Sequence, residues 1–211
     1  MLVFIFEEQR KKSMKAVEIF DKLWERYDSW YERNKDIFIK EINFIRKHLG
    51  EFKLGLEVGV GTGRFAKELG IRYGIDLSTS MLKLAKSRGI EVVKANAELI
   101  PFKRVFDLIL YAFTLCFLED PIKSLKSARD VLIEGGKVVI CTVPKDSKLA
   151  EEYMNRRDNP FYSNARFYTT SEVVKMLEDS GFKVIKIDFE DIKYGRDLLV
   201  VVAVDRKDVL T

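Results

Sequence analysis

The chain has 211 residues, 33% of them charged and 47% hydrophobic, with a formal net charge of +4 at pH 7. This balance favours one globular domain, large enough to bury about 70% of its unfolded surface. The positive charge is small and evenly spread, which argues against a nucleic-acid partner. Lys and Glu are abundant, whereas Gln9 is the only glutamine, a bias seen in thermophile proteins.

The cysteines and the apolar start of the chain bear on its compartment. Cys116 and Cys141 both lie in apolar runs, which favours free thiols in a reducing cytoplasm over a disulfide or a metal site. Residues 1–6 are apolar, but two glutamates follow, and a membrane span needs roughly 20 apolar residues. We therefore expect a cytoplasmic protein without membrane or metal. Residues 1–6 would form an arm packed on the domain or an ill-defined start.

The first fifty residues have the periodicity of helices. Apolar side chains recur three and four positions apart in two successive runs, and a glycine suited to a helix C-terminus ends the second run. The sequence thus predicts a helical cap over residues 1–50. The two runs are Val17, Phe20, Trp24, Tyr27 and Tyr31, and then Phe38, Ile42, Ile45 and Leu49, before Gly50.

A glycine-rich turn follows the first predicted strand, residues 54–58. Gly59, Gly61 and Gly63 are spaced two apart, and a helical pattern begins directly after them. Glycine tolerates positive φ and lets backbone approach a ligand, while the helix start offers unpaired N–H groups. The pattern predicts a nucleotide-binding turn, with a plain tight turn as the alternative. A dinucleotide fingerprint would place its third glycine at the position of Arg64.

Strands and helices alternate through the rest of the chain. Only a short turn, residues 194–197, joins the last two strands, so they must pair antiparallel. We expect an α/β three-layer sandwich: a seven-stranded, mostly parallel sheet with an antiparallel last strand, helices on both faces and the N-terminal helices added. The chain would form a single domain, 1–211. The predicted strands are 54–58, 72–75, 91–95, 106–112, 137–143, 182–189 and 198–204.

Capping residues mark three of the predicted helices. One begins after Ser78 and one near Pro121, where Asp120 can cap the first turn. A third begins at Thr169, which forms a capping-box pair with Glu172, and stops at a glycine, 181.

Ligands of open α/β sheets bind at the carboxyl ends of the strands. The second predicted strand leads into Asp76, whose carboxylate can accept hydrogen bonds from both hydroxyls of a ribose. A helix N-cap is the alternative role, but Ser78 or Thr79 suits it better. We therefore assign Asp76 to ribose binding.

Four segments together resemble a known family. They are Glu57 with the Gly-x-Gly-x-Gly turn, the block 94–102 (Lys-Ala-Asn-Ala-Glu-Leu-Ile-Pro-Phe), the block 105–121 with its Asp-Pro helix start, and 132–140 with its Gly-Gly turn. They are similar to the class I S-adenosylmethionine (SAM) methyltransferases, best to the small-molecule type, and the likeness runs from about residue 20 to 204. The resemblance implies the sheet described above, SAM as cofactor and methyl transfer as activity.

The resemblance also implies individual roles. In the family the first polar side chain of the 94–102 block meets the adenine amino group. This chain has Asn96 there in place of an aspartate, and its amide offers both an acceptor and a donor. A tyrosine at the place of Tyr27 closes over the methionine part of the cofactor, although core packing is the alternative. The implied cofactor-binding residues are Tyr27, Glu57, Gly59, Gly61, Gly63, Asp76, Leu77, Met81, Asn96, Ala97, Glu98, Tyr111 and Phe113.

No catalytic residue is assigned. SAM carries an activated methyl group, so the protein has mainly to align a nucleophile and exclude water. We expect Glu57 to organise the turn and the cofactor's amino group. We expect His48 to be a solvated surface side chain aided by the helix dipole. Any general base would come from a lid-like segment, 144–168. Its aromatic residues, Tyr153, Phe161, Tyr162, Phe167 and Tyr168, would line a substrate pocket or only anchor the loop.

Two classes of acceptor are disfavoured by missing motifs. The Pro-Cys nucleophile of cytosine-5 enzymes is absent, since Thr142 follows Cys141 and Pro144 comes later. The family's Asp/Asn-Pro-Pro-aromatic motif for base amino groups is replaced by residues 111–114. A small-molecule acceptor is favoured, with an RNA- or protein-modifying methyltransferase as the alternative. Arg64 and the final strand pair argue against a nicotinamide-dependent oxidoreductase. A SAM-binding protein without activity is also compatible with the sequence.

Overall fold

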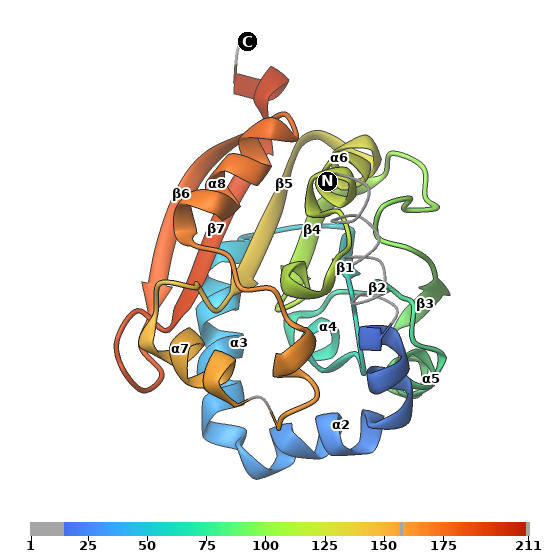
Figure 1. Ribbon diagram of the computed structural model, residues 1–211. Coiled ribbons are helices and arrows are strands. Elements are labelled where there is room, and N and C mark those ends of the chain that lie inside the picture. Colours follow the sequence, from blue (N-terminus) through green and yellow to red (C-terminus); the bar gives the residue numbers. More distant parts are fainter. Residues whose placement is uncertain (1–14, 157, 210–211) are drawn as a thin grey trace, which may run out of the picture.

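The computed structural model describes residues 15–156 and 158–209, and the predicted arm of residues 1–6 lies outside them (Figure 1). One seven-stranded sheet forms the centre, with the strand order β3-β2-β1-β4-β5-β7-β6. Its strands are β1 (Gly55–Val58), β2 (Tyr73–Asp76), β3 (Glu91–Lys94), β4 (Phe106–Ala112), β5 (Leu132–Thr142), β6 (Phe182–Glu190) and β7 (Leu198–Asp205).

The last strand is antiparallel, as predicted. β7 lies between β5 and β6 and runs antiparallel to both, whereas β1 to β5 pair in parallel. Asp197 fixes the turn that makes this reversal possible. Its buried Oδ2 accepts hydrogen bonds from the backbone N–H groups of residues 192 to 195. Burial alone would raise the pKa of Asp197, but these four N–H groups outweigh it and lower the pKa.

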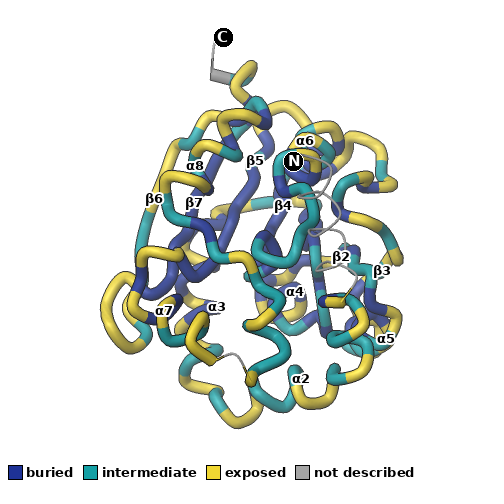
Figure 2. Tube along the Cα trace, in the orientation of Figure 1, coloured by how far each residue is buried: buried dark blue, intermediate teal, exposed yellow. Residues whose placement is uncertain are grey.

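Helices cover both faces of the sheet, which confirms the three-layer sandwich. α3 (Lys35–Leu49), α4 (Arg64–Leu69) and α5 (Thr79–Ser87) pack on one face, and α6 (Pro121–Val131) and α8 (Thr170–Asp179) on the other. Side chains of β4 alternate between the two cores: Leu108 and Leu110 face the first group of helices, and Ile109 and Tyr111 the second. In Figure 2 the inner strands β1, β4 and β7 are mostly buried, whereas the edge strands β3 and β6 are mostly exposed or intermediate.

Two further helices cross the carboxyl end of the sheet. They are α2 (Trp24–Arg33) and α7 (Lys148–Asn155), and both lie low in Figure 1. Residues 15–22 are helical too. Three short 3-10 turns complete the described chain: η1 (Leu115–Phe117), η2 (Tyr162–Asn164) and η3 (Arg206–Val209).

The predicted helix caps are present. The side chain of Ser78 accepts a hydrogen bond from Met81 N, and the side chain of Asp120 accepts one from Lys123 N. Thr169 and Glu172 form the reciprocal capping box of α8, with Gly181 just beyond its end. These helices begin and end where local side-chain chemistry satisfies the free backbone groups.

β5 differs from its predicted range, because it begins at Leu132 rather than near residue 137. Leu132 pairs with Phe106, but the next pair along β4 is Leu108 with Lys137. The register shift is taken up around Gly135, whose φ is +73°. The Gly-Gly pair is therefore an irregularity inside the strand, not a turn before it.

His48 is buried, so the prediction of a solvated surface side chain was wrong. It lies at the end of α3, edge-on to Phe44 at a ring-centroid distance of 5.2 Å. Its Nε2 is 3.1 Å from Asp188 Oδ2, without the alignment of a hydrogen bond. Burial, together with the charge of Lys186, lowers the pKa of His48, although Asp188 opposes the shift. His48 belongs to the apolar stripe of α3, which packs against the sheet.

Ion pairs attach α2 to the start of α4 and to the end of α5. Asp28 of α2 accepts two hydrogen bonds from Arg64 (2.8 and 2.6 Å) and two from Arg88 (2.9 Å each). Glu32 also contacts Arg64, at 2.6 Å. We call these four residues the Asp28 cluster. Burial would raise the pKa of Asp28, but the two guanidinium groups hold it well below its usual range. Arg64, which stands where a dinucleotide fingerprint would have its third glycine, therefore anchors α2.

Candidate active site

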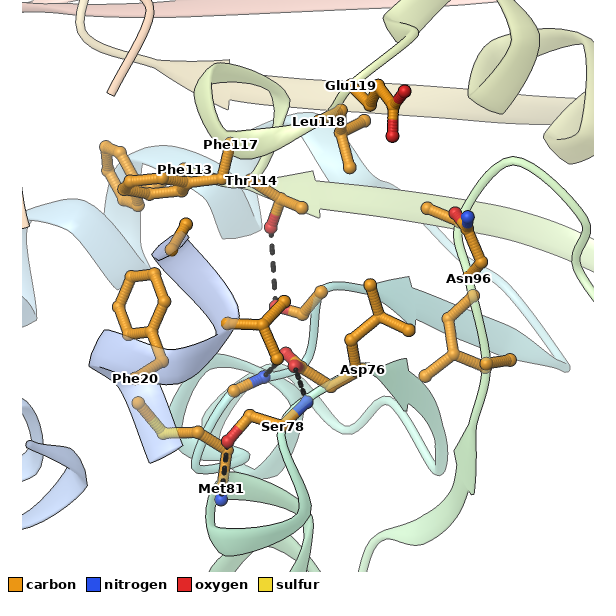
Figure 3. Close-up of a pocket in the computed structure, with 18 of the residues that line it drawn as sticks. Phe20, Asp76, Ser78, Met81, Asn96, Phe113, Thr114, Phe117, Leu118 and Glu119 are labelled. Atoms are coloured by element: carbon orange, nitrogen blue, oxygen red, sulfur yellow. Dashed lines mark hydrogen bonds between the residues drawn. The ribbon is translucent and has the colours of Figure 1, made fainter. Parts of the chain in front are cut away.

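A cavity of about 300 Å³ lies at the carboxyl ends of β1, β2 and β4 and beside the segment after β3 (Figure 3). Asp76, Ser78 and Met81 lie on one side of it, and Leu118 and Glu119 on the opposite side. The structure brings most of the predicted cofactor residues to its walls. These are Tyr27, Gly59, Gly61, Asp76, Leu77, Met81, Asn96, Ala97, Glu98 and Phe113.

The three glycines of the turn all have positive φ but serve different purposes. A Cβ on Gly59 would lie 2.2 Å from Thr114 Cγ2, and one on Gly63 would lie 2.9 Å from Ala85. Gly59 and Gly63 therefore permit close packing within the protein. A Cβ on Gly61 would find its nearest neighbour, a carbon of Tyr27, 4.0 Å away. Only Gly61 keeps open space on the cavity side, where a ligand can approach the backbone.

Asp76 connects the turn to α5. Its Oδ2 accepts a hydrogen bond from Gly61 N (2.9 Å), and its Oδ1 accepts one from Ser78 N (2.8 Å). Burial raises the pKa of Asp76, and these backbone N–H groups partly offset the rise. Each carboxylate oxygen can accept a second hydrogen bond. Because Ser78 caps α5, Asp76 is free of the capping role.

Asn96 and Glu98 are positioned by their own loop. Asn96 Oδ1 accepts a hydrogen bond from Glu98 N (2.9 Å). Glu98 Oε1 in turn accepts one from Asp120 N (3.1 Å), and its other oxygen lies 3.4 Å from Lys123 Nζ. The loop after β3 is therefore attached to the start of α6, which holds the Asn96 side chain at the cavity wall.

Three of the predicted residues do not line the cavity. Tyr111 lies in the core on the α6 face, and its hydroxyl is 2.9 Å from Ser124 Oγ. Gly63 packs against α5, as described above. Glu57, in β1, is 1% exposed, and its Oε2 has no hydrogen-bond partner among the described residues. Burial raises the pKa of Glu57 well above its ordinary value.

A second cavity of about 270 Å³ adjoins the first. The two share four aromatic residues, which we call the aromatic wall: Phe20, Tyr27, Phe113 and Phe117. Phe113 has a φ of +55°, which is rare for a bulky residue and is held here by the packing around it. Segment 144–168 supplies much of the remaining lining, including Leu149, Tyr153, Phe161, Tyr162 and Phe167.

Sequence reasoning missed Glu41, a polar residue of the second cavity. Glu41 belongs to α3 and is 8% exposed, and its Oε2 has no hydrogen-bond partner in the part of the chain that the structure describes. Burial raises the pKa of Glu41 to about 8. A signal was available, because Glu41 lies three residues after Phe38 and four before Ile45, on the apolar stripe of the helix. Carboxylates are rarely buried, so a glutamate on the apolar stripe of a helix is a candidate functional residue.

Comparisons with known proteins agree with this geometry. Residues 56–140 match the family model of a methyltransferase domain. A solved SAM-dependent methyltransferase of Thermotoga maritima, described as a possible histamine N-methyltransferase, is 32% identical with a TM-score of 0.80, and the match covers 89% of this chain and 98% of that one. An uncharacterized protein of Methanocaldococcus jannaschii, MJ1123, is 42% identical over 81% of this chain and 83% of its own. The ubiquinone/menaquinone biosynthesis C-methyltransferase UbiE of Klebsiella pneumoniae is 27% identical over 69% of this chain and 71% of its own.

The chain belongs to the SAM-dependent methyltransferases, and its cofactor is SAM. Two observations on the structure fit this cofactor: the open space at Gly61 and the unpartnered buried carboxylate oxygen of Glu57 below the turn. None of the helices within residues 15–156 and 158–209 has the length and apolar character that a bilayer crossing requires.

Proposed function

We propose that this protein transfers the methyl group of SAM to a small-molecule acceptor held in the second cavity. The observation that carries the proposal is that the two cavities adjoin at the aromatic wall. SAM supplies a methyl group already activated by its sulfonium, so the chain has to bind, align and dehydrate the reactants. Two cavities with a common wall meet this requirement.

Three polar side chains, two in the wall of the first cavity and one buried below the glycine turn, would bind parts of the cofactor. Asp76 would bind the ribose hydroxyls through the second lone pair of each oxygen. Asn96 would bind the adenine edge. Since its Oδ1 already accepts from Glu98 N, its Nδ2 group is the freer partner. Glu57 would organise the turn and receive the cofactor's cationic amino group, which would give its buried oxygen a partner.

The size of the second cavity, about 270 Å³, favours a small acceptor. Segment 144–168 contributes six apolar or aromatic side chains to its lining, which supports the proposed role of this segment as a lid. The names of two similar proteins, a quinone-biosynthesis C-methyltransferase and a possible histamine N-methyltransferase, also refer to small acceptors.

Binding of the cofactor can be tested with a matched pair of variants. Gly61 and Gly70 both have positive φ (+52° and +74°), and a Cβ meets no close neighbour at either. Gly61→Val would fill the first cavity, whereas Gly70→Val would impose comparable backbone strain outside it. We expect S-adenosylhomocysteine (SAH) to raise the melting temperature of the wild type and of Gly70→Val, but not of Gly61→Val.

The same measurement with NAD tests which nucleotide the first cavity binds. NAD should leave the melting temperature of the wild type unchanged. Stabilisation by NAD without SAM or SAH, or full SAH stabilisation of Gly61→Val, would contradict the assignment of the first cavity. Incubation of a metabolite pool with methyl-labelled SAM would then reveal the acceptor as a labelled small molecule. Label found only in RNA or protein would reject the small-molecule part of the proposal.

A further inference from the structure

The second cavity contains one buried ionisable carboxylate among aromatic side chains. Glu41 lines this cavity, is more than nine-tenths buried, and its Oε2 has no hydrogen-bond partner. A buried carboxylate without a partner is costly, so proteins retain one mainly where a ligand or cation completes it. The inference that follows rests on the proposed function, because it concerns the acceptor held in that cavity.

We infer that the acceptor carries a primary or secondary amine, and that Glu41 receives its ammonium group while the surrounding aromatic rings hold an apolar body. The carboxylate supplies the opposite charge and an acceptor for N–H donors. The faces of Tyr and Phe attract the same cation. Glu41 and this aromatic lining together define a receptor for a small hydrophobic amine.

Within residues 15–156 and 158–209, the surroundings of Glu41 offer it no internal cation. The titratable groups whose pKa its charge influences are Tyr27 and Tyr31 of α2, Cys141 of β5, Tyr153 of α7 and Tyr162 of η2. Burial raises the pKa of each of them, so all are neutral at neutral pH.

Among the described lining residues, the cations lie at the rim of the cavity. Arg26 and Arg33 are both exposed there, and Arg33 donates a hydrogen bond to Ser29 Oγ. No ion pair of Glu41 is found among the described residues. A ligand ammonium would therefore be the first positive charge to reach its Oε2.

The packing of the rings supports a flat or compact body for the ligand. Tyr153 and Tyr162 stack at a centroid distance of 4.2 Å, and Phe161 lies 5.7 Å from Tyr27. These pairs line the cavity that Glu41 enters from α3. An amine attached to a short arm on an aromatic ring would place the ring among them and the nitrogen at Glu41.

The inference predicts a specific pH dependence of binding. Burial raises the pKa of Glu41 to about 8, so below that pH the empty cavity holds a neutral carboxyl, which must ionise to pair with an ammonium. An alkylamine stays protonated to about pH 10. Amine affinity should therefore rise about tenfold per pH unit between pH 6 and pH 7 and level off above pH 8.

The test uses 2-phenylethylamine and its uncharged analogue 2-phenylethanol as probes, with SAH present. Isothermal titration calorimetry should give the wild type a preference for the amine of at least tenfold at pH 8, with the pH dependence above. Glu41→Gln should lose that preference and the pH dependence, yet bind the alcohol as the wild type does. The control Glu51→Gln, an exposed site beyond the end of α3, should behave as the wild type.

Equal affinity of the wild type for amine and alcohol, or amine binding unaffected by Glu41→Gln, would overturn the inference. SAH binding by the same proteins distinguishes a failure of the acceptor assignment from a failure of the proposed function. If SAH binds normally and the amine is not preferred, the acceptor assignment fails and the proposed function stands. If SAH does not bind the wild type, the proposed function itself fails. Should Glu41→Gln not fold, the amine preference of the wild type and its pH profile still decide.

Discussion

Replacing Glu41 by Gln measures what the buried carboxyl costs when no ligand is present. Its ordinary pKa is 4.5, and burial raises it to about 8 in the folded protein. Between these values the folded state keeps a proton that the unfolded state has lost, so the free energy of unfolding falls as pH rises. Each pH unit in this window costs about 1.4 kcal/mol. Above pH 8 the loss is complete.

Glutamine does not titrate, so the variant avoids this loss. Relative to the wild type, Glu41→Gln should gain about 2–3 kcal/mol of unfolding free energy between pH 5 and pH 7. Urea denaturation at pH 5, 6, 7 and 8 measures the difference, and Glu51→Gln serves as the exposed control. If the curves of wild type and Glu41→Gln run parallel over this range, the carboxyl is solvated or paired in the folded protein. Glu41 would then not be the buried, unpaired carboxyl that the amine inference requires.

Three other predictions concern residues that stabilise the fold around the two cavities. Gly59→Ala should cost about 2–3 kcal/mol of unfolding free energy, since its Cβ would lie 2.2 Å from Thr114 Cγ2. Thr114→Ala should restore part of this loss, whereas strictly additive effects in urea denaturation would refute the contact. Asp28→Asn should cost about 1–3 kcal/mol at pH 7, because it removes the partly buried carboxylate that Arg64 and Arg88 share. Since the pKa of Asp28 is lowered, its contribution is present above pH 4 and is lost at lower pH, so the gap between the two proteins should narrow in acid. His48, the only histidine, should titrate below pH 6.5 in an NMR titration because its pKa is lowered. Stability should accordingly rise with pH through that window, and a midpoint at or above 6.5 would contradict its burial.

Elements whose signals are local were predictable from the sequence. The range 106–112 of β4, the capping box at Thr169 and the antiparallel final strand follow from apolar runs, cap chemistry and a short turn. Each depends on neighbours within a few residues. The glycine turn and Asp76 also lie together as expected, because parallel strands bring their carboxyl ends to one edge.

Features that depend on packing partners were harder to predict. Tyr111 and Phe113 are two residues apart, yet Tyr111 lies in the core on the α6 face while a positive φ at Phe113 turns the chain towards the cavities. His48 was judged from its place near a helix end, as a solvated side chain, and Glu41 was not singled out from the sequence. Their positions on the stripe of α3 outweighed their chemistry. For both, the helical phase was the better guide.

The Asp28 cluster has a consequence for how ligands and solution conditions act on this enzyme. Tyr27 belongs to the aromatic wall, and the next residue, Asp28, holds α2 against Arg64 and Arg88. Arg88 also donates a hydrogen bond of 2.6 Å to the carbonyl of Thr62, inside the glycine turn. A ligand that displaced Tyr27 would therefore strain the ion pairs of the Asp28 cluster, and salt weakens the same pairs. We therefore expect the affinity of the two cavities for their ligands to depend on ionic strength.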